Sequence, residues 1–196
     1  MARARTTITA LTLGACALLA SGTAPAAATG TSPFPTGEPI SDTGYQPAEN
    51  LPPSEPTRAC GTRVVLDEVD RYFAVEERVR EYRGGITRID GRGQLIISVA
   101  AEDGRRARLD ASGPYTIVVH ARTGVTDVYL RGATVLLPRN AIEAAATREA
   151  GLPRFAQYSG RTHLRDTSDP RTDEPQASEV LDRPRFVTNA CHLLHR

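Results

Sequence analysis

The sequence predicts a mainly β protein: an antiparallel meander, curved into an open barrel or a two-layer sandwich, with one short helix. Two observations predict this fold. Between residues 60 and 187, runs in which apolar and polar side chains alternate are separated by glycine-rich corners. Two cysteines, Cys60 and Cys191, bracket the region, which predicts a domain closed by one disulfide in an oxidising compartment.

The extended runs follow one another with turn residues between them. Gly91 and Gly93 predict a bulge or kink between two of the runs. Residues 165–177 are polar, and we expect a long loop there, followed by a short helical segment at 189–195. The predicted strands are 64–75, 78–83, 86–90, 94–101, 107–111, 115–121, 125–131, 134–137, 155–164 and 180–187.

Two hairpins allow a register to be predicted. A three-residue loop ending at Gly104 sets Val99 opposite Ala107, which keeps the apolar residues on one face. A turn at 122–125 places His120 opposite Asp127, on the face away from the apolar residues.

One helix is predicted, over residues 140–150. Asn140 is a good N-cap, and Glu143 three residues later completes a capping box. Gly151 suits the position that follows a helix end, and Pro153 prevents continuation.

The N-terminal residues match an export signal. Residues 1–5 carry two arginines, residues 6–20 are uncharged, and small residues precede a cleavage position at about Ala28. We therefore expect a signal peptide over 1–28, a Pro-rich disordered linker over 29–57 and a β-rich domain over 58–196, in a secreted protein. A minor alternative is a lipoprotein anchored at Cys16, because residues 13–16 resemble a lipobox.

Composition excludes several function classes. Removing Arg3 and Arg5 with the signal leaves 22 of the 24 basic residues against 23 acidic ones, a net charge of about −1, which excludes a typical nucleic-acid binder. No segment after the signal is long and apolar enough for a transmembrane anchor. The absence of Trp and the 5% aromatic content disfavour a carbohydrate-binding surface.

Few residues are candidates for chemistry. His120 opposite Asp127 is an acid–base pair in form, but such cross-strand pairs are more often surface ion pairs. His192 and His195 share a helical spacing, but no further metal ligands accompany them, and no nucleophile motif is present. We therefore predict no catalytic, cofactor-binding or metal-binding residues, and only the disulfide pair Cys60 and Cys191.

Several short motifs are shared with a known group. They are Cys60-Gly-Thr62 and the stretches 109–114, 130–134, 136–138 and 149–153, together with the late Cys191. With them, the chain resembles a group of uncharacterised exported β-rich proteins of high-GC Gram-positive bacteria. The resemblance covers roughly residues 60–194 and implies architecture only.

Two classes of function remain open from the residues. The first is an exported non-catalytic domain that binds a small apolar ligand or a cell-envelope partner, since a curved meander can hold a ligand inside. The second is a secreted hydrolase that uses His120 or His163. A cavity lined by aliphatic side chains would favour the first class, and a cleft where a histidine, a carboxylate and a hydroxyl converge would favour the second.

Overall fold

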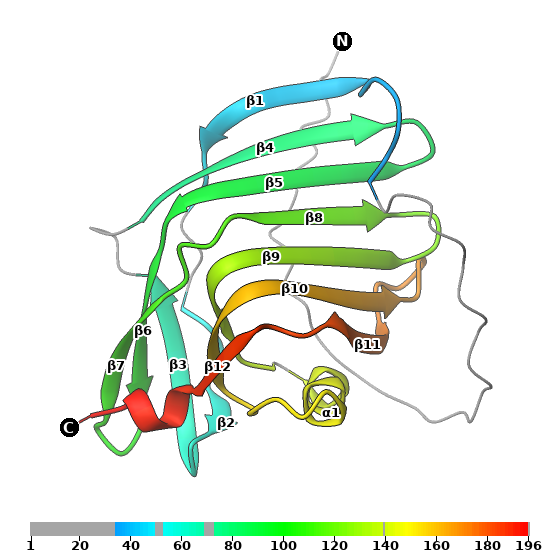
Figure 1. Cartoon of the computed structure of the whole chain (residues 1–196). Helices are drawn as coiled ribbons and strands as arrows, with labels where there is room; N and C mark the ends of the chain where they lie inside the picture. Colours follow the sequence, from blue (N-terminus) through cyan, green and yellow to red (C-terminus); the bar gives the residue numbers. More distant parts are fainter. Residues whose placement is uncertain (1–33, 50–52, 69–72, 139, 196) are drawn as a thin grey trace.

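The structure is a computed structural model that describes residues 34–49, 53–68, 73–138 and 140–195. Within these residues the chain forms two antiparallel sheets, neither of them closed, and one α-helix, so the predicted mainly β class is confirmed (Figure 1). The larger sheet has the order β1-β4-β5-β8-β9-β10-β11, with β12 also paired to β10. Its strands are β1 (Ser41–Pro47), β4 (Ala74–Tyr82), β5 (Ile86–Gln94), β8 (Tyr115–His120), β9 (Val125–Leu136), β10 (Ala156–Ser168), β11 (Pro175–Asp182) and β12 (Phe186–Asn189).

The smaller sheet holds the main hydrophobic cluster. Its order is β2-β3-β6-β7, formed by β2 (Thr57–Ala59), β3 (Thr62–Glu68), β6 (Ile96–Ala101) and β7 (Arg106–Asp110). Figure 1 shows its strands running steeply across the direction of the larger sheet. The buried cluster joins this sheet to the start of β10 and to the 3₁₀ helix η2 (Ala190–Leu193); its members are Ala59, Val64, Val99, Ala101, Leu109, Phe155, Ala190 and Leu194.

The chain passes from one sheet to the other at Leu95, between β5 and β6. The predicted bulge at Gly91–Gly93 is wrong, because β5 pairs with β4 without a register shift as far as Gln94. Strand β5 therefore continues past both glycines, and the chain leaves the larger sheet only at Leu95.

The hairpin between β6 and β7 has the predicted register. Val99 lies opposite Ala107, and Ile97 lies opposite Leu109. Gly104 has a φ of +88°, the left-handed conformation that a three-residue loop of this kind requires. Val99 and Leu109 are buried, as an apolar face turned toward a core should be.

The hairpin between β8 and β9 differs from its predicted register by two residues. Val118 lies opposite Asp127, and His120 lies opposite Val125. The turn occupies residues 121–124, where the amides of Thr123 and Gly124 both donate to the His120 carbonyl over 3.0 Å. The predicted pairing of His120 with Asp127 is therefore wrong, although both side chains stay on the predicted face.

The helix α1 (Ala141–Glu149) begins and ends as predicted. The Glu143 amide donates to Asn140 Oδ1 over 2.9 Å, and Asn140 Nδ2 donates to the Glu143 carboxylate over 3.0 Å. The helix packs beside β11 (Figure 1).

Two segments predicted to lack regular structure are strands. Within the predicted linker 29–57, Ser41–Pro47 forms β1, which pairs with β4 at the edge of the larger sheet. Within the predicted loop 165–177, β10 continues to Ser168 and β11 begins at Pro175. Both predictions are wrong for the same reason. These strands lack the apolar alternation that marks a strand in a sequence, because backbone pairing and charged side chains hold them in the sheet.

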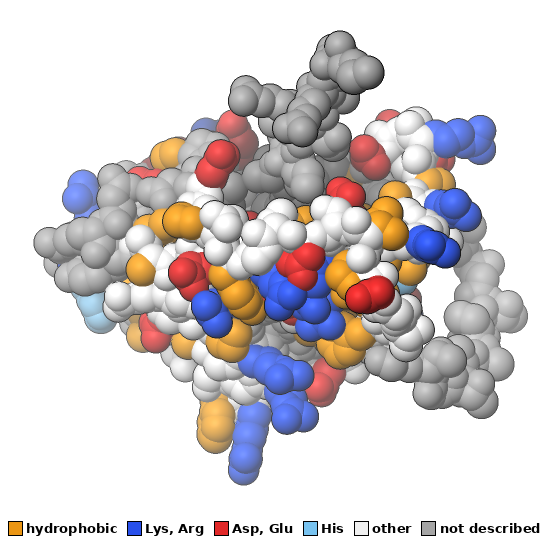
Figure 2. All heavy atoms as spheres, turned by 90° about the horizontal axis from the view of Figure 1, so that it is seen from above, with side chains coloured by type: hydrophobic (Ala, Val, Ile, Leu, Met, Phe, Trp, Pro, Cys, Tyr) orange, Lys and Arg blue, Asp and Glu red, His pale blue; other side chains and the backbone are white. Residues whose placement is uncertain are grey.

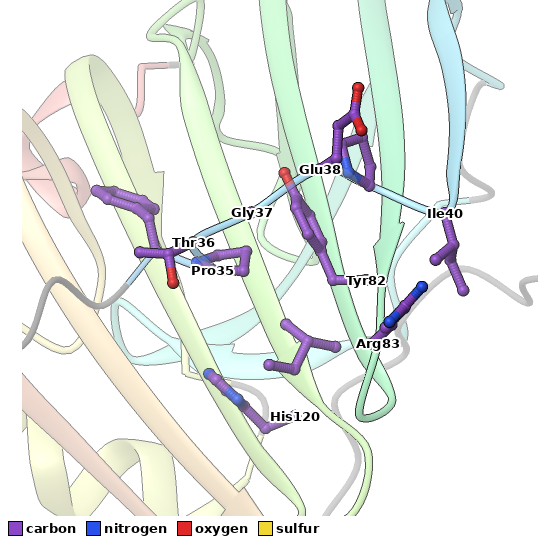
Figure 3. A pocket seen from close by; sticks show the side chains of 11 residues that line it. Pro35, Thr36, Gly37, Glu38, Ile40, Tyr82, Arg83 and His120 are labelled. Carbon is purple, nitrogen blue, oxygen red and sulfur yellow. The ribbon is translucent and has the colours of Figure 1, made fainter.

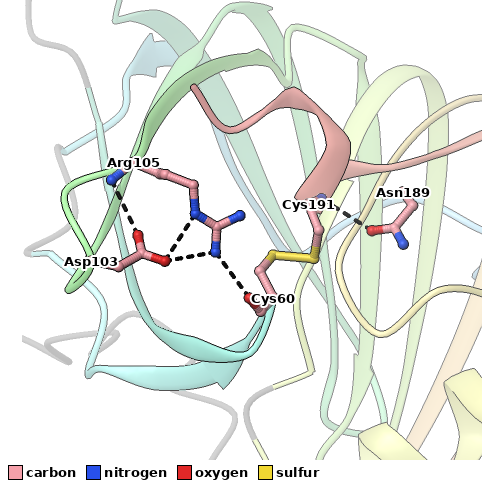
Figure 4. The surroundings of a disulfide bond; sticks show 5 residues. All are labelled: Cys60, Asp103, Arg105, Asn189 and Cys191. Atoms are coloured by element: carbon pink, nitrogen blue, oxygen red, sulfur yellow. Dashed lines mark hydrogen bonds and ion pairs between the residues drawn. A yellow bond between two sulfur atoms is a disulfide. The ribbon is translucent and has the colours of Figure 1, made fainter. Parts of the chain in front are cut away.

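Cys60 and Cys191 form the expected disulfide, with their Cα atoms 5.2 Å apart (Figure 4). It ties the turn between β2 and β3 to η2. Arg105 donates to the Cys60 carbonyl over 3.0 Å, and Asn189 caps η2 by accepting from the Cys191 amide over 3.0 Å. A disulfide indicates a domain that folds outside the cytoplasm.

The predicted signal peptide 1–28 and the alternative lipidation site Cys16 lie outside the described residues. Among the residues that are described, no helix has the length and hydrophobicity needed to cross a membrane.

Candidate functional site

One face of the larger sheet is strongly polar. Because side chains alternate along each strand, the pairings of the larger sheet bring charged residues of five strands, β1, β4, β5, β9 and β10, onto this face. Seen from the β1 edge (Figure 2), basic and acidic side chains lie beside one another rather than in areas of single charge. We call this surface the polar face; its titratable members are Asp42, Glu76, Arg78, Arg80, Arg88, Asp90, Arg92, Asp127, His163 and Arg165.

The opposite face of the same strands is aliphatic. One row of directly paired residues crosses six strands from β4 to β11, and every member is half-buried. The row is Val79, Ile89, Ile117, Val128, Leu164 and Val180. Along each strand these aliphatic residues alternate with residues of the polar face, so the alternation in the sequence separates the two faces of the sheet.

Asp90 is the centre of a first network on the polar face. Arg88 donates to Asp90 Oδ1 over 2.8 Å, Thr116 donates to the same oxygen over 2.7 Å, and Arg80 forms an ion pair with Oδ2. Burial by itself raises the pKa of Asp90, but the hydrogen bonds from Arg88, Thr116 and Arg80 outweigh it and hold that pKa below its ordinary value. The carboxylate is therefore a structural anion that orients two arginines.

Asp127 is the centre of a second network. His163 Nε2 and Arg165 Nε lie 2.7 and 2.9 Å from the same Asp127 oxygen, Oδ1. The Asp127 side chain is only 4% exposed. A histidine held by a buried carboxylate is the arrangement of a general base with its orienting group, but here the carboxylate is shared with an arginine.

A row of aromatic rings extends from His163 through Tyr129 to Phe34. The Tyr129 ring stacks on the His163 ring with centroids 4.2 Å apart, and the Phe34 ring packs on Tyr129 at 4.9 Å. The Arg88 guanidinium lies 4.7 Å from the Phe34 centroid, so Phe34 bridges the two networks. Burial, with a smaller contribution from the Asp127 charge, raises the pKa of Tyr129 to about 12, so its hydroxyl stays protonated at neutral pH.

A pocket lies at one end of the polar face, between residues 34–40 and the strands β4, β5 and β8 (Figure 3). Its volume is about 730 Å³. Tyr82, Ile86 and His120 form its floor, and Figure 3 shows Tyr82 and His120 reaching from the strands toward the segment that covers them. Its lining presents apolar and polar surface in similar amounts; the apolar wall residue used below is Phe34.

The structure separates the histidines proposed from the sequence. His120 lines the pocket and lies opposite Val125, two residues along β8 from the position opposite Asp127, whereas His163 contacts Asp127. His192 lies in η2, and His195 forms a bridge with Arg106. In the part of the chain that the structure describes, no group of three or more metal-ligating side chains gathers.

Sequence reasoning missed both networks. Arg78 pairs with Asp42 on β1 and Arg80 pairs with Asp90 on β5, and no motif in the sequence predicted either partner. The only sequence signal was that Asp90 and Asp127 fall on the polar side of an alternating strand. Which cation each carboxylate meets depends on strand order.

Comparison with known proteins adds no further assignment: no family model, no curated protein and no solved structure matches this chain. The pocket and the two networks are therefore interpreted from their geometry.

Proposed function

We propose that this protein is a secreted, non-catalytic domain that binds a small, mostly apolar ligand in the pocket beneath residues 34–40. The observation that carries the proposal is the group of apolar side chains that this pocket contains, to which Phe34, Tyr82 and Ile86 contribute. Pockets for small ligands measure about 300–1,000 Å³ and combine apolar side chains with a few polar groups, and the volume of this pocket, about 730 Å³, lies within that range.

The energetic basis is burial of apolar surface. Each methylene group removed from water contributes about 0.8 kcal/mol. Burial of six to eight carbons therefore supplies enough binding free energy to offset the cost of the translational and rotational freedom that the ligand loses. Such a ligand does not need to pair with Asp90 or Asp127, because both carboxylates already contact basic side chains within the sheet.

The test uses N-phenyl-1-naphthylamine, an uncharged probe whose fluorescence rises in an apolar site. Ile86→Trp places a bulky ring in the pocket, and Ile89→Trp makes the same change on the same strand but on the aliphatic face. We expect the wild-type protein and Ile89→Trp to bind the probe, and Ile86→Trp to bind it about 10-fold more weakly. Absence of probe binding to the wild-type protein, or equal binding by both variants, would overturn the proposal.

Secretion is part of the same proposal. It is supported by the three-part pattern of residues 1–28 and by the disulfide. The intact mass of the protein recovered from culture medium tests it: we expect a chain starting near residue 29, and acylation at Cys16 would show the lipoprotein instead.

A hydrolase that uses His163 is the second candidate, favoured by the contact between His163 and Asp127. Its test is the hydrolysis of p-nitrophenyl acetate and butyrate by the wild-type protein, His163→Gln and His120→Gln. Turnover above buffer that disappears only in His163→Gln would support this candidate. Equal background rates for all three proteins would favour the binding domain.

A further inference from the structure

Resting on the proposed function, we infer that the ligand is an amphipathic anion: an apolar body with a carboxylate at the end of the pocket formed by Arg83 and His120. Both residues line the pocket, and both lie at the hairpin end of the sheet, Arg83 just after β4 and His120 at the end of β8. Arg122 is close by, since its side chain lies 3.7 Å from the position that a Cβ on Gly85 would take.

The charges at this end differ from those of the polar face. Five arginines of the polar face are each bound to a carboxylate, in the pairs Arg78–Asp42, Arg80–Asp90, Arg88–Asp90, Arg92–Glu76 and Arg165–Asp127. For Arg83 and Arg122, by contrast, the described residues supply no ion pair. The positive charges of Arg83, in the pocket lining, and of nearby Arg122 are therefore not balanced by a bound carboxylate, whereas those of the five arginines on the polar face are.

The rest of the lining limits where the anion can lie. Glu38, the acidic side chain of the wall, lies at the end opposite His120 in Figure 3. An anion is therefore attracted to the Arg83 end and repelled from the Glu38 end. The apolar body then lies between them, against Tyr82 and Ile86.

The experiment compares two ligands of equal chain length, octanoate and octanol, as competitors of N-phenyl-1-naphthylamine. Arg83→Gln removes the charge and keeps most of the length, and Arg106→Gln removes an exposed arginine of the smaller sheet as a matched control. We expect octanoate to bind about 5-fold more tightly than octanol, as a charge-assisted contact at an exposed site provides. Arg83→Gln should abolish this preference, whereas Arg106→Gln should leave it unchanged.

The outcomes separate the two proposals. If the probe does not bind the wild-type protein, the proposed function fails. If the probe binds but octanol competes as well as octanoate, the binding domain stands and the anionic ligand is wrong. A preference for octanoate that survives in Arg83→Gln would also overturn the inference, because the anion would then be recognised elsewhere. Weakening of the preference by added salt supports the charge contact.

Discussion

His163 on β10 contacts Asp127 on β9 diagonally, with Nε2 2.7 Å from Oδ1, while the residue directly opposite Asp127 in the register is Arg165. One buried carboxylate therefore contacts both the arginine directly opposite it and a diagonal histidine. The two contacts fix the pairing of β9 with β10 on the polar face, next to the Phe34 and Tyr129 rings.

Asp127→Asn should destabilise the fold. The change leaves His163 and Arg165 without their anion in a place where the Asp127 side chain is only 4% exposed. Removing one partner of a buried hydrogen-bonded group costs about 1–3 kcal/mol, and this range applies here because Arg165 is itself 41% exposed. Urea denaturation measures the loss. The matched control is Glu76→Gln, whose side chain is 48% exposed in its pair with Arg92 and which should cost less than about 1 kcal/mol. Equal losses for the two variants would contradict the structural role of Asp127.

Asp90 should make the protein sensitive to acid. The pKa of Asp90 in the folded protein lies below its ordinary value of 3.8. The unfolded chain therefore takes up a proton at a higher pH than the folded one, so Asp90 contributes stability above about pH 4 that is lost as the pH falls through the folded pKa. The free energy of unfolding, measured at intervals from pH 6 to pH 2, should fall less steeply in Asp90→Asn than in the wild-type protein. Parallel curves would show that Asp90 is not a source of the acid sensitivity.

Loss of the disulfide should lower stability strongly. The bridge closes a loop with a sequence separation of 131 residues. The loop-entropy relation gives up to about 5 kcal/mol for a loop of this length. We expect the Cys60→Ser/Cys191→Ser double variant to melt well below the oxidised protein and close to the protein treated with dithiothreitol. Two thiols that alkylate freely in the untreated protein would show that the bridge does not form.

Phe34→Ala should loosen the cover of the pocket. The ring packs on Tyr129 and beneath the Arg88 guanidinium, and these contacts hold residues 34–40 against the sheet. Hydrogen exchange in residues 36–40 should become faster, and the affinity for N-phenyl-1-naphthylamine should fall about 3-fold to 10-fold, because an apolar wall is lost. Phe186→Ala is the control, since that ring is 63% exposed and remote from the pocket. Similar effects of both changes would argue against Phe34 as the cover.

Part of the fold was predictable from local patterns. The capped helix at Asn140 and the hairpin at Gly104 have the predicted form because a cap and a short loop are settled by a few neighbouring residues. The strand β1 was not predictable, because Asp42 and its neighbours show no apolar alternation and become ordered only against β4. The candidate site was predictable only in its residue types: His120 and His163 were both candidates, and the predicted register placed His120 beside Asp127, where the structure has His163.

By itself, the sequence determined which side chains share a face. The row from Val79 to Val180 and the separation of Asp127 from it follow directly from alternation. Only the tertiary structure decided which residues meet. A slip of two residues between β8 and β9 keeps every side chain on its own face, so the hydrophobic pattern does not distinguish the two registers. The turn at 121–124 and the contacts of Asp127 with β10 select one of them, and that choice places His163 beside Asp127 and leaves His120 for the pocket.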